Sequence, residues 1–548
     1  MSKITKFVKN TRTVERTGAE VNYMGGISYK INPIDTLKMV TASSIFGEPQ
    51  YYRDGAFAPA TIPDGTFRLH SLFKEYAVIG DHFEGKKTSQ VMEQVIDDAL
   101  DYDYEATLEW AVTLRKEYFM RLNPQVIMVR AAMHPGRAVF TEKYPGRFAE
   151  INGQVMQRAD EPAAQLMYYL YWKGSKQGIP SILKRSWASR LEGLNAYQVH
   201  KYKNTGIGMI DVVRIAHAHS EVLDELMKTG DVKVDEEDNT WEAMRSAGAD
   251  WKKIYGAGVL RHMALLRNLR GIFTEIEDSG FCRKVLDNLK KGVRSGKQFP
   301  FRYYSAMSAV NGSGCSHQPQ ILDTLEDCMD IACENMPQLK GKTMCLSDNS
   351  GSAWGAFTSE YGSVTVAKID NLSSVITARN SDEGYVGKFG DKLIVYPVGK
   401  RNGVLSVAKG ISDTGSRDVG GATENGIWIF FRDAIDKKEH WDNIFIYSDM
   451  QAGHGGLYGT GEGIAEYRAH GYACGTSNNY VDVAKLIAEY RNKVNPKVNV
   501  FCIQTAGYSN VSVPEYGYRT NIMYGWTGKE AVFADAMIKF WDEKDAQK

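Results

Sequence analysis

Residues 345–352 read Cys-Leu-Ser-Asp-Asn-Ser-Gly-Ser and place one carboxylate and two hydroxyls at alternate positions, Asp348, Ser350 and Ser352. If the chain leaves a strand and bends here, all three side chains can face one point. Carboxylate and hydroxyl oxygens are suitable ligands for a hard divalent cation such as Mg²⁺ and suit zinc or copper poorly. The motif therefore indicates half of an octahedral metal site.

Two further ligands can come from later in the chain. Thr423 ends the segment Gly-Gly-Ala-Thr, and Asp449 follows an apolar, strand-like run. The alternative is a serine-rich turn in which Asp348 caps a helix. Because Thr423 and Asp449 each lie next to an apolar strand-like run, in the order that such a site needs, we expect a magnesium site made of all five residues.

A second candidate group is basic. Residues 173–203 contain seven Lys and Arg side chains and one acid, Glu192, although the whole chain has 66 basic and 66 acidic residues. Lysine and arginine contacts to phosphate supply most sequence-independent affinity for nucleic acids. Four aromatic residues are interleaved and can stack on unpaired bases, at about 1–3 kcal/mol each. The alternative is a solvated helix face with core aromatics; the four are Trp172, Trp187, Tyr197 and Tyr202.

The type of secondary structure that the sequence predicts around these residues changes near Pro337. Before it, short segments with helical periodicity are joined by Pro, Gly and Asn turns, which favours stacked helical pairs. After it, strand-like and helical runs alternate, which favours a doubly wound, mostly parallel sheet with ligands at the carboxyl ends of its strands. The expected helices are 89–100, 105–119, 160–172, 206–228 and 256–272, then 363–377, 424–437, 481–493 and 529–541; the expected strands are 343–347, 392–398, 404–407, 444–448, 498–503 and 521–525.

Size and composition limit the protein class. A chain of 548 residues with 43% apolar and 24% charged residues is long enough for two or more domains. It has no run of 18 apolar residues and no secretory h-region near Met1, so neither a membrane partner nor secretion is expected. Seven cysteines without Cys-x-x-Cys spacing fit free thiols in a reducing cytoplasm.

Several motifs together resemble the Ro autoantigen family, in which a TROVE module of HEAT-like helical repeats precedes a von Willebrand factor A domain. The A-domain likeness covers most of 340–545 and includes the 348–352 motif, Gly-Gly-Ala-Thr at 420–423 and Tyr-Ser-Asp at 447–449. The TROVE likeness is patchier and includes Ala-Leu-Leu-Arg-Asn-Leu at 264–269. The resemblance implies a TROVE ring over 1–338 and an A domain over 339–548, in a bacterial or phage-type member.

The resemblance also implies a function in RNA quality control or degradation. Family members bind Y RNAs on the outside of the ring and single-stranded 3′ ends of misfolded RNAs in its central hole, and bacterial relatives assist exoribonucleases such as polynucleotide phosphorylase. The A domain carries a metal-dependent adhesion site (MIDAS) that matches Asp348, Ser350, Ser352, Thr423 and Asp449. We expect a monomeric ring that holds a single-stranded end through basic residues, with double-stranded stems resting on its outer basic face. These basic residues are Lys184, Arg185, Arg190, Lys201, Lys203, Arg214 and Arg267.

The chain departs from the family pattern in two places. Many relatives have a histidine two residues before the position of Asp211, where this chain has Met209. Residues 57–87 do not align.

A structural alternative also exists for Arg267, which could pair with a buried carboxylate between helices.

A binding protein, not an enzyme, is the expected class. A metal-dependent RNA hydrolase is a second hypothesis, but only Asp348 and Asp449 would supply carboxylates, and two-metal nucleases use several. A helical-repeat scaffold that binds proteins without RNA is a third. An ATPase is excluded, because a P-loop ending at Gly341-Lys342 needs a glycine where Met336 stands.

Overall fold

The computed structural model describes most of the chain between residues 88 and 546 and short segments before it. Residues 57–87, Thr423 and Asp449 lie outside the described residues. The described ranges are 19–21, 27–30, 32–42, 88–116, 120–204, 207–234, 240–296, 298, 300–355, 365–421, 424–448, 450, 473–474, 480–481, 483–505, 510–511, 518–524 and 530–546.

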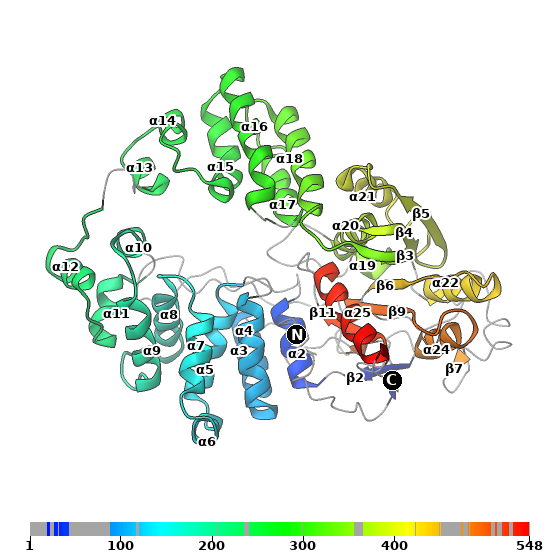
Figure 1. The fold of residues 1–548 in the computed structure, drawn as a ribbon, viewed down its shortest axis with the longest axis horizontal. Coiled ribbons are helices and arrows are strands. Elements are labelled where there is room, and N and C mark those ends of the chain that lie inside the picture. The colour runs from blue at the N-terminus through cyan, green and yellow to red at the C-terminus, as the bar shows by residue number, and fades with distance from the viewer. Residues whose placement is uncertain are drawn as a thin grey trace.

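The first part of the chain is rich in helices, as the periodicity predicts, and Figure 1 shows them following one another along an arc. Helix α8 begins beside Pro162, where proline is tolerated because the first-turn N–H groups have no partner within the helix. The helices are α2 (Pro33–Ala42), α3 (Thr88–Tyr102), α4 (Tyr104–Lys116), α5 (Asn123–Met133), α6 (Gly136–Lys143), α7 (Arg147–Val155), α8 (Glu161–Lys173), α9 (Ser181–Glu192), α10 (Ala196–Tyr202), α11 (Met209–Ala216), α12 (Glu221–Thr229), α13 (Trp241–Ser246), α14 (Trp251–Gly256), α15 (His262–Glu275), α16 (Ser279–Gly296), α17 (Pro300–Val310) and α18 (Gln318–Cys333).

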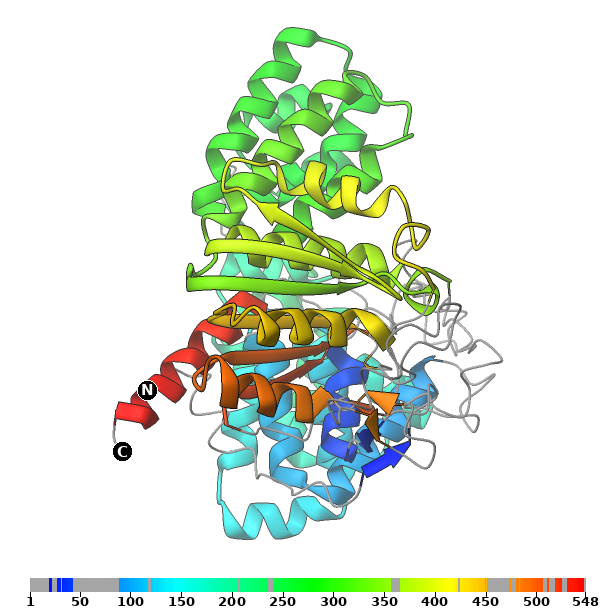
Figure 2. The same ribbon diagram turned by 90° about the vertical axis from the view of Figure 1, so that its right-hand side faces the viewer.

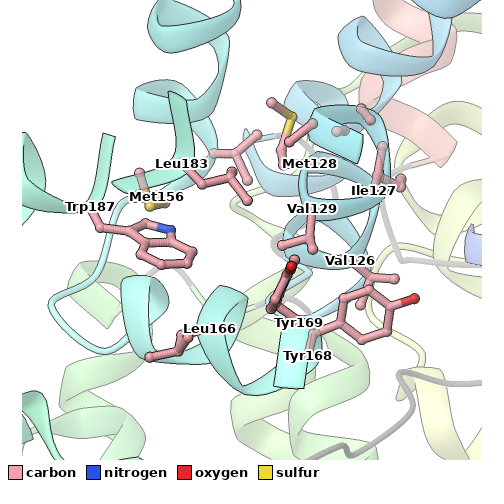
Figure 3. Close-up of a cluster of buried hydrophobic side chains, with 14 of the residues drawn as sticks. Val126, Ile127, Met128, Val129, Met156, Leu166, Tyr168, Tyr169, Leu183 and Trp187 are labelled. Carbon is pink, nitrogen blue, oxygen red and sulfur yellow. The ribbon is translucent and has the colours of Figure 1, made fainter. Parts of the chain in front are cut away.

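Apolar side chains from successive helices pack into a continuous core in the first half of the arc. Figure 3 shows Val126 and Val129 of α5 on the side that faces Tyr168 and Tyr169 of α8, with Trp187 of α9 close to Met156. All of these side chains are nearly inaccessible to solvent. A second core begins at α14, so the helical region has two hydrophobic clusters, divided after α12.

The second part contains a six-stranded sheet in the order β11-β9-β6-β3-β4-β5. All neighbouring strands are parallel except β4 and β5. Its helices are α19 (Gly351–Gly355), α20 (Val366–Arg379), α21 (Val404–Ser412), α22 (Glu424–Asp436), α24 (Val483–Lys493) and α25 (Glu530–Ala546). The strands are β3 (Leu339–Asp348), β4 (Ser381–Phe389), β5 (Leu393–Val398), β6 (Asn443–Ser448), β9 (Asn499–Gln504) and β11 (Thr520–Tyr524).

Side chains alternate between the two faces of this sheet. Met344 and Leu346 pack with α22 and α24, whereas Cys345 between them packs with α20, α21 and α25. Figure 2 shows α22 and α24 running alongside the strands. Because helices cover both faces, the observed unit is a mixed α/β sheet of the kind that the sequence predicts. The predicted division into 1–338 and 339–548 falls immediately before β3.

Both ends of the helical arc contact the α/β unit. At one end, α2 packs against β11, and β2 (Ile27–Lys30) pairs with both β1 (Ala19–Val21) and β10 (Asn510–Val511). At the other end, α18 packs against α21. Ala353 and Val366 of the α/β unit also belong to the core of the first helices. A small hairpin, β7 (Ala473–Cys474) with β8 (Tyr480–Val481), completes the described strands.

Three sequence predictions of elements are wrong. Residues 404–407 begin a helix instead of a strand, because carboxylates of α18 accept hydrogen bonds from the N–H groups of its first turn, Asp330 from Val404 and Glu326 from Ser406. The predicted helix 206–228 is two helices, since His217 takes a left-handed conformation and ends α11. The predicted helix 256–272 begins later than expected, because α14 ends at Gly256 and α15 begins only at His262.

Strand β4 was not predicted at all. Its glycines and acidic residues are poor strand formers. Gly384 is needed where it stands, because a Cβ there would lie 1.8 Å from the carbonyl oxygen of Ala378 at the end of α20.

The cysteines whose side chains are described, six in number, are free, as the sequence predicts, and all six are buried. Within the described ranges, no helix combines the length and apolar character that a membrane crossing requires.

Candidate metal centre and nucleic-acid interface

The metal motif lies at the carboxyl edge of the sheet. Asp348 is the last residue of β3, which is flanked by the parallel strands β4 and β6, and the chain then turns into α19. Helices and strands around it leave Asp348 and Ser350 without solvent contact. This is the edge at which open parallel sheets bind ligands.

Hydrogen bonds bring the described motif residues together. One oxygen of Asp348 accepts the N–H of Ser350 at 2.9 Å, and the other accepts the hydroxyl of Ser448, from the end of β6, at 2.7 Å. The hydroxyl oxygens of Ser350 and Ser352 lie 3.1 Å apart. One carboxylate and two adjacent hydroxyls form an all-oxygen donor set, which fits Mg²⁺ better than a soft metal.

Thr423 and Asp449 cannot be placed in the same way, because both lie outside the described residues. Their neighbours do reach the motif. Gly421 accepts a hydrogen bond from the N–H of Gly351 at 2.8 Å, and Ser448 contacts Asp348 as described. Three of the five predicted ligands therefore come together, and the other two stay predictions.

A buried amide pair supports the motif from α20. Asn349 and Asn371 exchange two hydrogen bonds at 2.8 and 3.0 Å, and Asn371 also accepts from Ser347 at 2.7 Å. All three side chains are fully buried. Sequence reasoning missed Asn371 and Ser448; the signal for the former was a run of polar residues inside an otherwise apolar helix.

Six of the seven predicted RNA-binding residues lie in one part of the helical arc. Lys184, Arg185 and Arg190 are on α9, and Arg214 is on the adjacent α11. Lys201 is on α10, and Lys203 follows its end. Arg267 lies apart from them, on α15, whose core belongs to the second hydrophobic cluster (Figure 1).

The seven basic side chains differ in what surrounds them. Lys203 forms an ion pair with Asp231, which also contacts His200 at 2.9 Å. Partial burial alone would raise the pKa of Asp231, but hydrogen bonds from Lys203, the Val232 N–H and His200 lower it to about 2. Lys203 is thus neutralised locally. The guanidinium of Arg190 already has a partner, because it donates a hydrogen bond to the backbone carbonyl of Gln157 at 2.6 Å.

The remaining cations are more accessible. Arg185, Arg214 and Arg267 are exposed, and none forms an ion pair with another described residue, so pairing of Arg267 with a buried carboxylate does not occur among those residues. The ammonium of Lys201 lies 5.7 Å from the ring centres of both Tyr197 and Tyr202. Lys184 is half-buried on the same helix as Arg185.

The aromatic residues divide into core and surface. Trp187 is fully buried and donates its indole N–H to Gln165 at 2.8 Å, so its predicted role in base stacking is wrong. Trp172 is half-buried, with Arg130 4.3 Å and Lys173 3.6 Å from its ring centre. Tyr197 and Tyr202 are also half-buried, so they keep some accessible ring surface.

The structure is similar to the crystal structure of the Ro (RSR) protein of Deinococcus radiodurans. The TM-score is 0.55 at 15% sequence identity, and the match covers 85% of this chain and 96% of that chain. Neither a family model nor a curated protein matches the sequence significantly. The predicted resemblance to Ro proteins is thus confirmed for the fold, which joins a helical region to an α/β unit.

Proposed function

We propose that this chain is an RNA-binding protein of the Ro type and acts in RNA quality control or degradation. The observation that carries the proposal is the fold match over 85% of the chain, which spans both the helical region and the α/β unit. The ligands would be a small Y-like RNA on the outside and single-stranded 3′ ends of misfolded RNA inside. The protein partner would be an exoribonuclease such as polynucleotide phosphorylase.

A ring closed by the α/β unit is part of this proposal. It is supported by the contacts of α2 with β11 at one end of the arc and of α18 with α21 at the other. The exposed cations of α9 and α11, with Lys201 beside two tyrosines, support phosphate contacts with a single strand.

The metal site would serve to bind a partner protein. Asp348, Ser350 and Ser352, with Thr423 and Asp449, would hold a divalent cation, and the bound cation would offer an open position to a carboxylate of a partner protein. We propose no catalytic step for this chain.

The test is filter binding of a structured RNA with and without a single-stranded 3′ tail, over a series of salt concentrations. The proposal predicts tighter binding of the tailed RNA and an affinity that falls as salt rises. Equal binding of both RNAs, or binding independent of salt, would count against it. Cleavage of labelled RNA by the purified protein with Mg²⁺ would favour a hydrolase instead.

A further inference from the structure

A cavity of about 510 Å³ opens where α5, α6 and the start of α9 meet, outside the metal centre. Figure 1 places α6 at the outer end of α5, away from the α/β unit. Gly178, Ile179 and Pro180 form one wall, and Met133 forms part of another. Its polar lining consists of Thr141, Ser181, Arg137 and Arg185.

The charge of this cavity is entirely positive. Arg137 and Arg185 are 48 positions apart in the sequence but line the same space, and no Asp or Glu lines it. Neither arginine forms an ion pair with another described residue. The Nε atom of Arg137 is shielded from solvent and has no hydrogen-bond partner in the described part of the chain.

The first turn of α9 adds to this positive potential. The helix begins at Ser181, and no side chain caps its N-terminus. Its first-turn N–H groups and its dipole favour a negative charge there. The hydroxyls of Ser181 and Thr141 can donate hydrogen bonds to the same group.

We propose that this cavity binds a phosphate monoester, with the 5′-terminal phosphate of an RNA as its source. At pH 7 a monoester carries a charge near −2, because its second pKa is about 6, whereas a phosphodiester within a strand carries −1. Two guanidinium groups match the dianion in charge and can each bind it with two hydrogen bonds.

The identification of RNA as the molecule that carries the phosphate rests on the proposed function. The inference that the cavity binds a phosphate monoester does not. The experiment therefore compares two short single-stranded RNAs of the same sequence, one with a 5′-phosphate and one with a 5′-hydroxyl, by fluorescence anisotropy with the full chain. Inorganic phosphate is added as a competitor. We expect the 5′-phosphorylated RNA to bind at least about tenfold more tightly, which is the size of one charge-assisted interaction.

Arg137→Gln should abolish that preference and leave the affinity for the 5′-hydroxyl RNA unchanged. Arg147→Gln, at the start of α7 and outside the cavity lining, is the control and should keep the preference. Arg137→Lys, which keeps the charge without the forked geometry, should give an intermediate preference.

Equal affinity of the wild-type protein for the two RNAs would overturn the proposal while leaving RNA binding standing, and this result needs no variant to fold. If neither RNA bound but calorimetry detected binding of inorganic phosphate that required Arg137, the phosphate site would be supported and the RNA function would fail. A 5′-phosphate preference that survives Arg137→Gln would place the monoester elsewhere and overturn the assignment to this cavity.

Discussion

The side chain of Gln165 joins four helices beneath the predicted RNA-binding surface. Its amide oxygen accepts the indole N–H of Trp187, from α9, at 2.8 Å. Its amide nitrogen donates to Gln125 of α5 at 2.8 Å and to Asn152 of α7 at 2.7 Å. All four side chains are fully buried, or nearly so, so water cannot replace a lost partner.

Gln165→Leu removes these three hydrogen bonds, together with a longer one that the Asn152 amide nitrogen donates to Gln165 at 3.4 Å, and keeps a side chain of similar volume. Each buried polar group that loses its partner costs about 1–3 kcal/mol, and burial of the leucine side chain returns roughly 2 kcal/mol. We therefore expect a net loss of about 4 kcal/mol in the free energy of unfolding of the helical region.

Urea unfolding followed by tryptophan fluorescence measures this loss. The matched control is Gln177→Leu, at an exposed position whose contacts are made by its backbone, and it should change stability by less than about 0.5 kcal/mol. If Gln165→Leu cost less than 1 kcal/mol with an unchanged denaturant slope, the reasoning that this network holds α9 in place would be refuted.

Other perturbations test the surface, the sheet and the metal centre. Asp231→Asn should release Lys203 and steepen the dependence of log affinity on log salt by about 0.7 for a single strand, measured by filter binding; an unchanged slope would show that Lys203 does not reach phosphate. Because the pKa of Asp231 is lowered from 3.8 to about 2, its stabilising contribution is complete above pH 3.8 and is lost as the pH falls toward 2, and an acid titration should show this loss in the wild type but not in Asp231→Asn. Gly384→Ala should destabilise the sheet by about 1–3 kcal/mol in urea unfolding, because its Cβ would overlap a carbonyl of α20. Asp348→Ala should abolish Mg²⁺ binding in calorimetry and leave RNA affinity intact, whereas the exposed control Asp323→Ala should change neither; loss of RNA binding with Asp348→Ala would show that the two sites are one.

The sequence correctly predicted the elements whose stability comes from the pattern of their own residues. Strands with continuous apolar runs, such as β6, and helices with a regular apolar stripe, such as α3, lie close to where periodicity puts them. It missed elements that form because of contacts with residues far away in the sequence. Strand β4 depends on close approach to α20 at Gly384, and α21 begins where two carboxylates of α18 accept its first amides.

The same division holds at the candidate sites. Asp348, Ser350 and Ser352 are adjacent in sequence, so their convergence follows from one turn. Ser448 approaches Asp348 across 100 residues, and only the register between β3 and β6 brings it there. The neutralisation of Lys203 by Asp231 likewise requires that α10 and α12 pack together, which no local pattern indicates.

Photocrosslinking of the full chain to a 3′-tailed RNA, with mass-spectrometric identification of the modified peptides, tests RNA binding by the helical arc most directly. We expect crosslinks in peptides from α9 to α11, near Tyr197 and Tyr202, that are lost when excess unlabelled tailed RNA is added. Crosslinks confined to the α/β unit, or none above those of a control protein, would contradict the proposal that this chain is a Ro-type RNA-binding protein.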